Sequence, residues 1–149
     1  MVERRKIDNP FVVKVSREFK ASAERVFDAW LDPENVGNWL FSTPDGKGKV
    51  CKVDPRVGGN FEIGEMRGDD FANHVGTYHE IDRPNRLVFS YYMETVNEDM
   101  PSTVIVEFSA KENGCVVLIT HEMDDIYAEY EASAVEGWNM IFDGLNNYI

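Results

Sequence analysis

The sequence predicts an α+β fold in which a curved, mainly antiparallel sheet of about six to seven strands wraps around one long C-terminal helix. Two short helices are expected after the first strand. Apolar and polar residues alternate in seven short stretches before residue 124, which is the pattern of half-buried strands. Beyond about residue 127 the apolar period changes to 3.6 residues, which indicates a helix. Most successive strands are joined by short turns, and this favours antiparallel pairing.

The first strand is expected at Phe11–Phe19, where apolar residues gather on one side. Ser22 can cap the helix that follows, because its side-chain oxygen can accept from a free backbone N–H. Asp32 and Pro33 end that helix, since proline cannot continue it. A second short helix is expected around Trp39.

Six further strands follow the two helices, at residues 49–53, 60–65, 74–81, 86–93, 103–110 and 115–123. The segment Asp54–Gly59 contains a proline and paired glycines, which suit a turn between strands. Asn113 and Gly114 form the strongest hairpin signal in the chain and join the last two strands.

The C-terminal helix is expected from about residue 127 to residue 149. Its apolar stripe comprises Tyr130, Ala134, Gly137, Trp138, Ile141, Leu145 and Tyr148. At 1.5 Å per residue such a helix runs roughly 35 Å, whereas a domain of this size has a radius of gyration of about 15 Å. Two short helices can close only one end of the space between this helix and a curved sheet. The remaining wedge is a candidate cavity.

Composition and charge narrow the function classes. The 149 residues include 15 Lys and Arg against 27 Asp and Glu, a net charge of −12, and are expected to form one domain with a loose segment at residues 1–10. The only basic cluster, Arg4–Lys6, is too small for nucleic acid or an anionic membrane. No signal peptide or membrane span is predicted. Cys51 and Cys115 fit buried free thiols, with a disulfide left open, and the cytoplasm is the expected compartment.

Several motifs, at their joint spacing over residues 11–149, resemble the Hsp90 ATPase activator homologue (AHSA1-like) family. They are Phe27–Trp30, Asp32–Glu34 ahead of Trp39, Asp54–Phe61, Gly76–Phe89, Thr120–Glu122 and Gly137-Trp138. The resemblance implies the helix-grip fold shared with START, Bet v 1-like and polyketide cyclase proteins, the SRPBCC superfamily. It also implies a hydrophobic ligand cavity between the sheet and the C-terminal helix. A chaperone partner, bound through the acidic surface, is an alternative.

The leading hypothesis is therefore binding of a small, mainly hydrophobic molecule in an internal cavity. The expected lining is Trp39, Phe61, Tyr78, Phe89, Tyr91, Val106, Phe108, Ile119, His121, Trp138, Ile141 and Leu145. Burial of apolar surface would supply the affinity, and a tyrosine, histidine or glutamate would orient the ligand. Glu80 shares the inward side by alternation, unless a bulge turns it outward.

His121 is the one candidate catalytic residue. With a carboxylate it could handle protons in a cyclase-like or hydrolase-like reaction; the alternative is a structural hydrogen bond. His74 and His79 are five apart on one strand and so face opposite sides, which makes them a poor metal pair. No metal and no cofactor is predicted. The oligomeric state stays open, with a homodimer as one alternative.

Overall fold

A computed structural model of the chain describes residues 7–149. The basic cluster Arg4–Lys6 and residues 1–6 of the expected loose segment lie outside the described residues; residues 7–10 form neither helix nor strand. The elements are β1 (Phe11–Phe19), α1 (Ala23–Trp30), η1 (Val36–Asn38), β2 (Lys47–Val53), β3 (Asn60–Arg67), β4 (Asp70–Asp82), β5 (Arg86–Met93), β6 (Ser102–Lys111), β7 (Gly114–Met123), η2 (Asp125–Tyr130) and α2 (Glu131–Tyr148).

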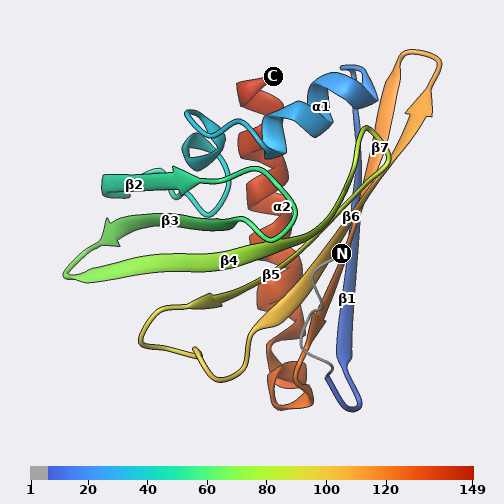
Figure 1. The fold of residues 1–149 in the computed structure, drawn as a ribbon. Helices are drawn as coiled ribbons and strands as arrows, with labels where there is room; N and C mark the ends of the chain where they lie inside the picture. Colours follow the sequence, from blue (N-terminus) through green and yellow to red (C-terminus); the bar gives the residue numbers. More distant parts are fainter. Residues whose placement is uncertain (1–6) are drawn as a thin grey trace.

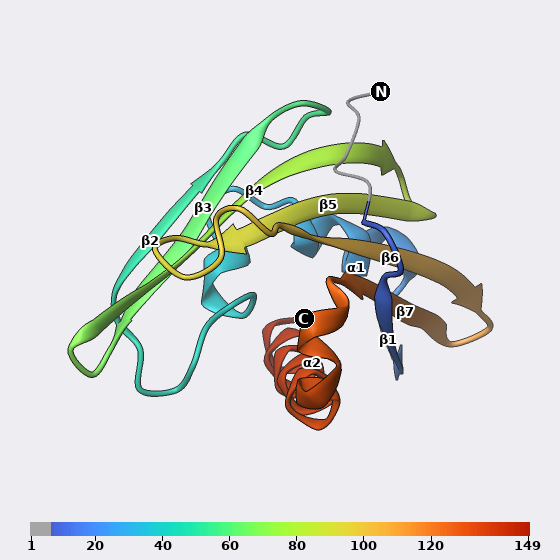
Figure 2. The ribbon, with the colours of Figure 1, turned by 90° about the horizontal axis from the view of Figure 1, so that it is seen from below.

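The strands form one antiparallel sheet in the order β1-β7-β6-β5-β4-β3-β2. The sheet is strongly curved, and α2 lies along its concave side (Figures 1 and 2). This arrangement confirms the predicted α+β class and the helix-grip architecture. None of the helices in the described part of the chain is long and apolar enough to cross a membrane.

The helices after β1 follow from local signals. The Ser22 side chain accepts a hydrogen bond from the backbone N–H of Arg25 at 3.2 Å, so α1 begins where the capping residue predicts. The second helix is a single 3₁₀ turn, η1, and Trp39 follows it as the capping residue. The chain between η1 and β2 passes close to the concave face and contributes residues 41–43 to the candidate site.

The C-terminal helix differs from the prediction in its start and in its buried face. A 3₁₀ segment, η2, occupies residues 125–130, so the α-helical period begins at Glu131 rather than near residue 127. Because the 3₁₀ turn is tighter than the α-helical one, Tyr130 leaves the apolar stripe and is 55% exposed. Phe142, which the predicted stripe omits, is fully buried against Phe19 of β1, with ring centroids 5.6 Å apart.

A register shift in β4 decides where its polar residues point. Tyr78 pairs with Phe89, but Glu80 pairs with Val88, so one extra residue lies in β4 at this point. Glu80 forms an ion pair with Arg86 at 3.0 Å on the convex side. The bulge therefore turns this carboxylate away from the cavity, which is one of the two alternatives that the sequence left open.

The core fills most of the wedge between the sheet and the helices. Trp30 and Trp39 pack edge to face with ring centroids 4.8 Å apart, and Phe61 packs in the same way on Phe89 at 5.6 Å. Both cysteines are free thiols; Cys115 is fully buried, as expected, whereas Cys51 is only partly buried. The aromatic packing near α1 closes that end of the wedge, and open space borders the first half of α2.

Candidate functional site: a cavity beside the C-terminal helix

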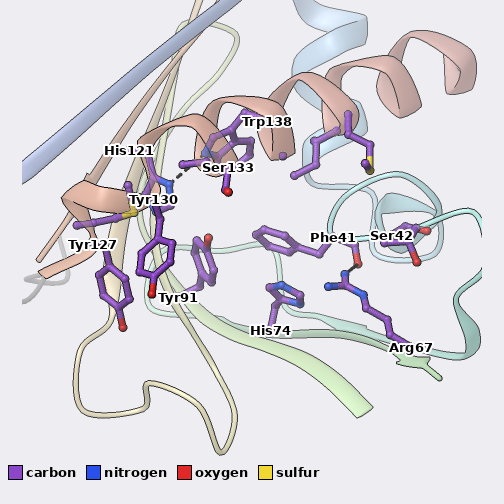
Figure 3. Close-up of a pocket in the computed structure, with 16 residues that line it drawn as sticks. Phe41, Ser42, Arg67, His74, Tyr91, His121, Tyr127, Tyr130, Ser133 and Trp138 are labelled. Atoms are coloured by element: carbon purple, nitrogen blue, oxygen red, sulfur yellow. Dashed lines mark hydrogen bonds between the residues drawn. The ribbon is translucent and has the colours of Figure 1, made fainter. Parts of the chain in front are cut away.

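A cavity of about 390 Å³ lies between the concave face of the sheet, η2, the first half of α2 and the loop after η1 (Figure 3). It is lined by Phe41, Ser42, Thr43, Arg67, His74, Tyr91, His121, Met123, Tyr127, Tyr130, Ser133, Ala134, Gly137, Trp138, Met140 and Ile141. Aromatic and aliphatic groups make up most of this lining, and a few polar groups are placed among them. Ligand pockets commonly have this composition.

The structure brings four of the twelve expected lining residues to this cavity: Tyr91, His121, Trp138 and Ile141. The other eight lie buried outside its lining, namely Trp39, Phe61, Tyr78, Phe89, Val106, Phe108, Ile119 and Leu145. Their side chains interlock with one another and with α1, for example Phe27 with Phe108 at 5.0 Å between ring centroids. These eight residues belong to the packed core.

His121 is held by hydrogen bonds at both ring nitrogens. The indole N–H of Trp138 donates to His121 Nδ1 at 3.0 Å, and Nε2 lies 2.8 Å from Ser102 Oγ. An indole nitrogen can only donate, so Nδ1 carries no proton and the ring is the neutral Nε2–H form. Burial lowers the pKa of His121 to about 4. The ring is thus neutral near pH 7, with both nitrogens engaged.

Tyr91 stands between the two cavity histidines, 5.7 Å from the His121 ring and 5.9 Å from the His74 ring. Figure 3 shows its hydroxyl end directed toward α2. Burial raises the pKa of the phenol to about 12, although a hydrogen bond with Ser102 acts in the opposite direction. The hydroxyl therefore keeps its proton and is a donor at the cavity wall.

His74 lies flat against Phe41, with ring centroids 4.1 Å apart and planes 3° apart. Its Nδ1 is 3.3 Å from the carbonyl oxygen of Ile63, which can only accept, so this nitrogen carries the proton. Burial, with a smaller effect from the Arg67 charge, lowers the pKa of His74 to about 4. Phe41 has a φ of 54°, in the left-handed region that non-glycine residues rarely adopt.

Arg67 and Glu65 fix the loop that closes one end of the cavity. Arg67 Nε donates to Glu65 Oε2 at 2.9 Å and Nη2 donates to the Phe41 carbonyl at 3.2 Å. Glu65 is 1% exposed and also accepts from the backbone N–H and the hydroxyl of Thr43, at 2.9 and 2.7 Å. Burial alone would raise the pKa of Glu65, but the hydrogen bonds from Thr43 and Arg67 lower it. The carboxylate stays charged.

Three prominent lining residues were missing from the expected set: Phe41, Arg67 and His74. Alternation along β3 places Arg67 on the same inward face of the sheet as Phe61. A charged residue at an inward position could therefore have identified Arg67 as a cavity residue from the sequence. His74 shares the inward side with Tyr78 by the same rule. Phe41 follows a 3₁₀ turn in irregular chain, where no periodic pattern applies. In residues 7–149 no group of three or more His, Cys, Asp or Glu residues could hold a metal ion.

Three solved structures show the same fold. Protein CV1439 from Chromobacterium violaceum is 21% identical, with a TM-score of 0.77, over 93% of this chain and 96% of that chain. Protein NE0264 from Nitrosomonas europaea is 18% identical, with a TM-score of 0.75, over 95% of each chain. CalU16 from Micromonospora echinospora is 24% identical, with a TM-score of 0.68, over 93% of this chain and 76% of that chain. At these identities the likeness concerns the fold alone.

Comparison at the level of families is more specific. No curated protein matches the chain. The family model described as "Activator of Hsp90 ATPase homolog 1-like protein" matches residues 20–149, which is most of the sequence and confirms the resemblance seen in its motifs. The chain therefore belongs to the family of activator of Hsp90 ATPase homolog 1-like proteins.

Proposed function

We propose that this protein binds a small, mainly apolar molecule in the cavity beside α2. The observation that carries the proposal is the cavity itself: about 390 Å³ of space walled mainly by aromatic rings and aliphatic groups. That volume lies within the range of about 300–1,000 Å³ typical of small-molecule pockets. The fold of this family commonly binds hydrophobic ligands, which agrees with the geometry.

The polar groups on the wall suit orientation of a ligand rather than chemistry on it. The Tyr91 hydroxyl can donate to a ligand oxygen, while apolar burial at roughly 25 cal/mol per Å² supplies the affinity. The cyclase-like or hydrolase-like alternative needs a carboxylate beside His121. Among the described residues that line the cavity there is no Asp or Glu, and both His121 nitrogens already have partners. The geometry therefore favours binding.

Gly137 offers a direct test, because it lies on the cavity wall and a Cβ added there would meet no atom within 4 Å. A Gly137→Phe side chain would enter the open space, whereas Gly137→Ala would leave it almost unchanged. We expect the wild type and Gly137→Ala to bind the neutral fluorescent probe N-phenyl-1-naphthylamine, and Gly137→Phe to lose at least about tenfold in affinity.

The same three proteins should be analysed by native mass spectrometry directly after purification. A bound molecule that leaves on denaturation, present in the wild type and Gly137→Ala and missing from Gly137→Phe, would identify the natural ligand class. If neither the probe nor any purified adduct distinguishes Gly137→Phe from Gly137→Ala, the cavity is not the binding site and the proposal is wrong.

A further inference from the structure

We propose that the occupant of this cavity is an amphipathic organic anion, with a planar apolar body against the aromatic wall and one acidic group at Arg67. The inference rests on the proposed binding function and specifies its ligand class. It is carried by the position of one cation at one end of an otherwise uncharged cavity. Arg67 is the only Lys, Arg, Asp or Glu among the described lining residues.

The charges around Arg67 leave a positive excess at that end. Glu65 lies between two cations, since its Oε2 is 2.9 Å from Arg67 Nε and its Oε1 is 3.9 Å from Lys49 Nζ. Lys49 also donates to the hydroxyl of Ser42, a lining residue. Within these contacts two cations face one carboxylate, in a chain whose net charge is −12; Asp70, the cross-strand partner of Arg67, is exposed at the end of the hairpin and makes none of these contacts. Such a local excess suits a ligand anion.

The hydrogen bonds of Arg67 leave one side of its guanidinium unused. Nε is taken by Glu65, and one N–H of Nη2 is taken by the Phe41 carbonyl. In the described part of the chain no acceptor takes the two N–H groups of Nη1 or the second N–H of Nη2. These groups lie on neighbouring nitrogens of a planar fork, which is the geometry that a carboxylate accepts with both oxygens. The side chain is 35% exposed and thus half-buried, so the contact would be only partly screened by water.

The remaining wall suits a flat, uncharged body. Figure 3 shows Phe41 and His74 on the Arg67 side of the cavity, with Tyr91 between them and the His121 end. Offset or edge contacts with such rings favour aromatic or conjugated ligands. His74 and His121 are both neutral near pH 7, so neither competes with Arg67 for an anion. The ligand would thus lie with its acidic end at the loop after η1 and its apolar end toward Tyr127.

Two matched probes separate charge from shape: 2-naphthoate, which carries a carboxylate, and 2-naphthamide, which is neutral and almost isosteric. Affinities measured by titration calorimetry at pH 7.5 should favour naphthoate by roughly tenfold or more in the wild type, as expected for a charge-assisted bidentate contact. Arg67→Gln should reduce that ratio to within about twofold. Arg56→Gln removes the same charge from an exposed loop residue outside the cavity and should leave the ratio unchanged.

The outcomes distinguish this inference from the function on which it rests. Equal or tighter binding of naphthamide in the wild type would overturn the anion assignment while leaving the binding function in place, and this comparison does not depend on any variant folding. Failure of naphthoate, naphthamide and N-phenyl-1-naphthylamine alike, together with no adduct in the native mass spectrum of the wild type, would overturn both. A preference for naphthoate that survives in Arg67→Gln, with its fold verified by circular dichroism, would show that another group binds the acid.

Discussion

A single hydrogen bond between α2 and β7 determines the state of His121. The indole of Trp138 supplies a donor that cannot act as an acceptor, so the imidazole must present a lone pair to it. Protonation at Nδ1 would break that contact and place a charge among apolar groups, which is why burial lowers the pKa of His121 to about 4. The residue that looked most like a catalyst in the sequence is thus part of the connection between helix and sheet.

Replacing Trp138 by phenylalanine should destabilise the protein more than the same change at Trp39. The two indoles are similarly buried, at 3% and 2% exposure, but Trp39 Nε1 has no hydrogen-bond partner within the described residues. Only Trp138→Phe leaves the His121 Nδ1 lone pair unpaired, which costs about 1–2 kcal/mol beyond the loss of packing. Urea unfolding of the two variants at pH 7.5 measures the difference. Equal losses of unfolding free energy would mean that this hydrogen bond contributes nothing net.

At the scale of elements, α2 combines a packing face and a cavity face. Trp138, Phe142 and Leu145 are buried against the sheet, while Gly137 and Ile141 border the open space. A glycine inside a helix costs about 1 kcal/mol relative to alanine. Nothing packs closely on Gly137, so the need for a small side chain there comes from the cavity and not from contact with a strand.

Gly137→Ala should therefore stabilise the ligand-free protein by about 0.5–1 kcal/mol, because alanine gains helix propensity and its Cβ meets no neighbour within 4 Å. Gly76→Ala is the opposite case: its Cβ would lie 2.2 Å from ring atoms of Phe61, so it should destabilise strongly. Thermal unfolding followed by circular dichroism compares the two variants with the wild type. A destabilised Gly137→Ala would contradict the open space beside this position of α2.

At the scale of the whole molecule, the buried histidines should make stability depend on pH. In the folded state burial lowers the pKa values of His74 and His121 to about 4, below the ordinary histidine value of 6.5. Between pH 6.5 and pH 4 these histidines bind more protons in the unfolded chain than in the folded protein. The free energy of unfolding is therefore highest above pH 6.5 and decreases as the pH falls toward 4. Each histidine contributes a slope of up to about 1.4 kcal/mol per pH unit.

Urea unfolding at pH 7.5, 6.5, 5.5 and 5.0 tests this dependence, and His74→Phe should remove about half of the slope while it keeps a ring against Phe41. Asp28, Asp32 and Glu65 also have lowered pKa values. The stabilisation that they provide is lost only as the pH falls below about 4.5 for Glu65 and below about 3.8 for the two aspartates, outside this range. Stability that stays constant from pH 7.5 to 5.0 would contradict the neutral buried state of both histidines.

The sequence by itself determined the elements whose signals are local. Alternation defined the bounds of β1 and β5, Ser22 marked the start of α1, and Asn113-Gly114 marked the hairpin between β6 and β7. These features depend on neighbours within a few residues, so the chain alone carries the information. The 3₁₀ start of the C-terminal segment escaped this reasoning because its apolar spacing over residues 125–130 resembles that of an α-helix.

Tertiary structure alone decided which inward residues pack and which border open space. Phe61 and Phe89 face inward as predicted, but whether such rings fill the wedge depends on volumes contributed by α1, η1 and the sheet together. The positions of Phe41 and Arg67 depend on the irregular loop that Glu65 holds in place through Thr43. A cavity is the space that packing leaves over, and that space is a property of the assembled chain, which no local pattern encodes.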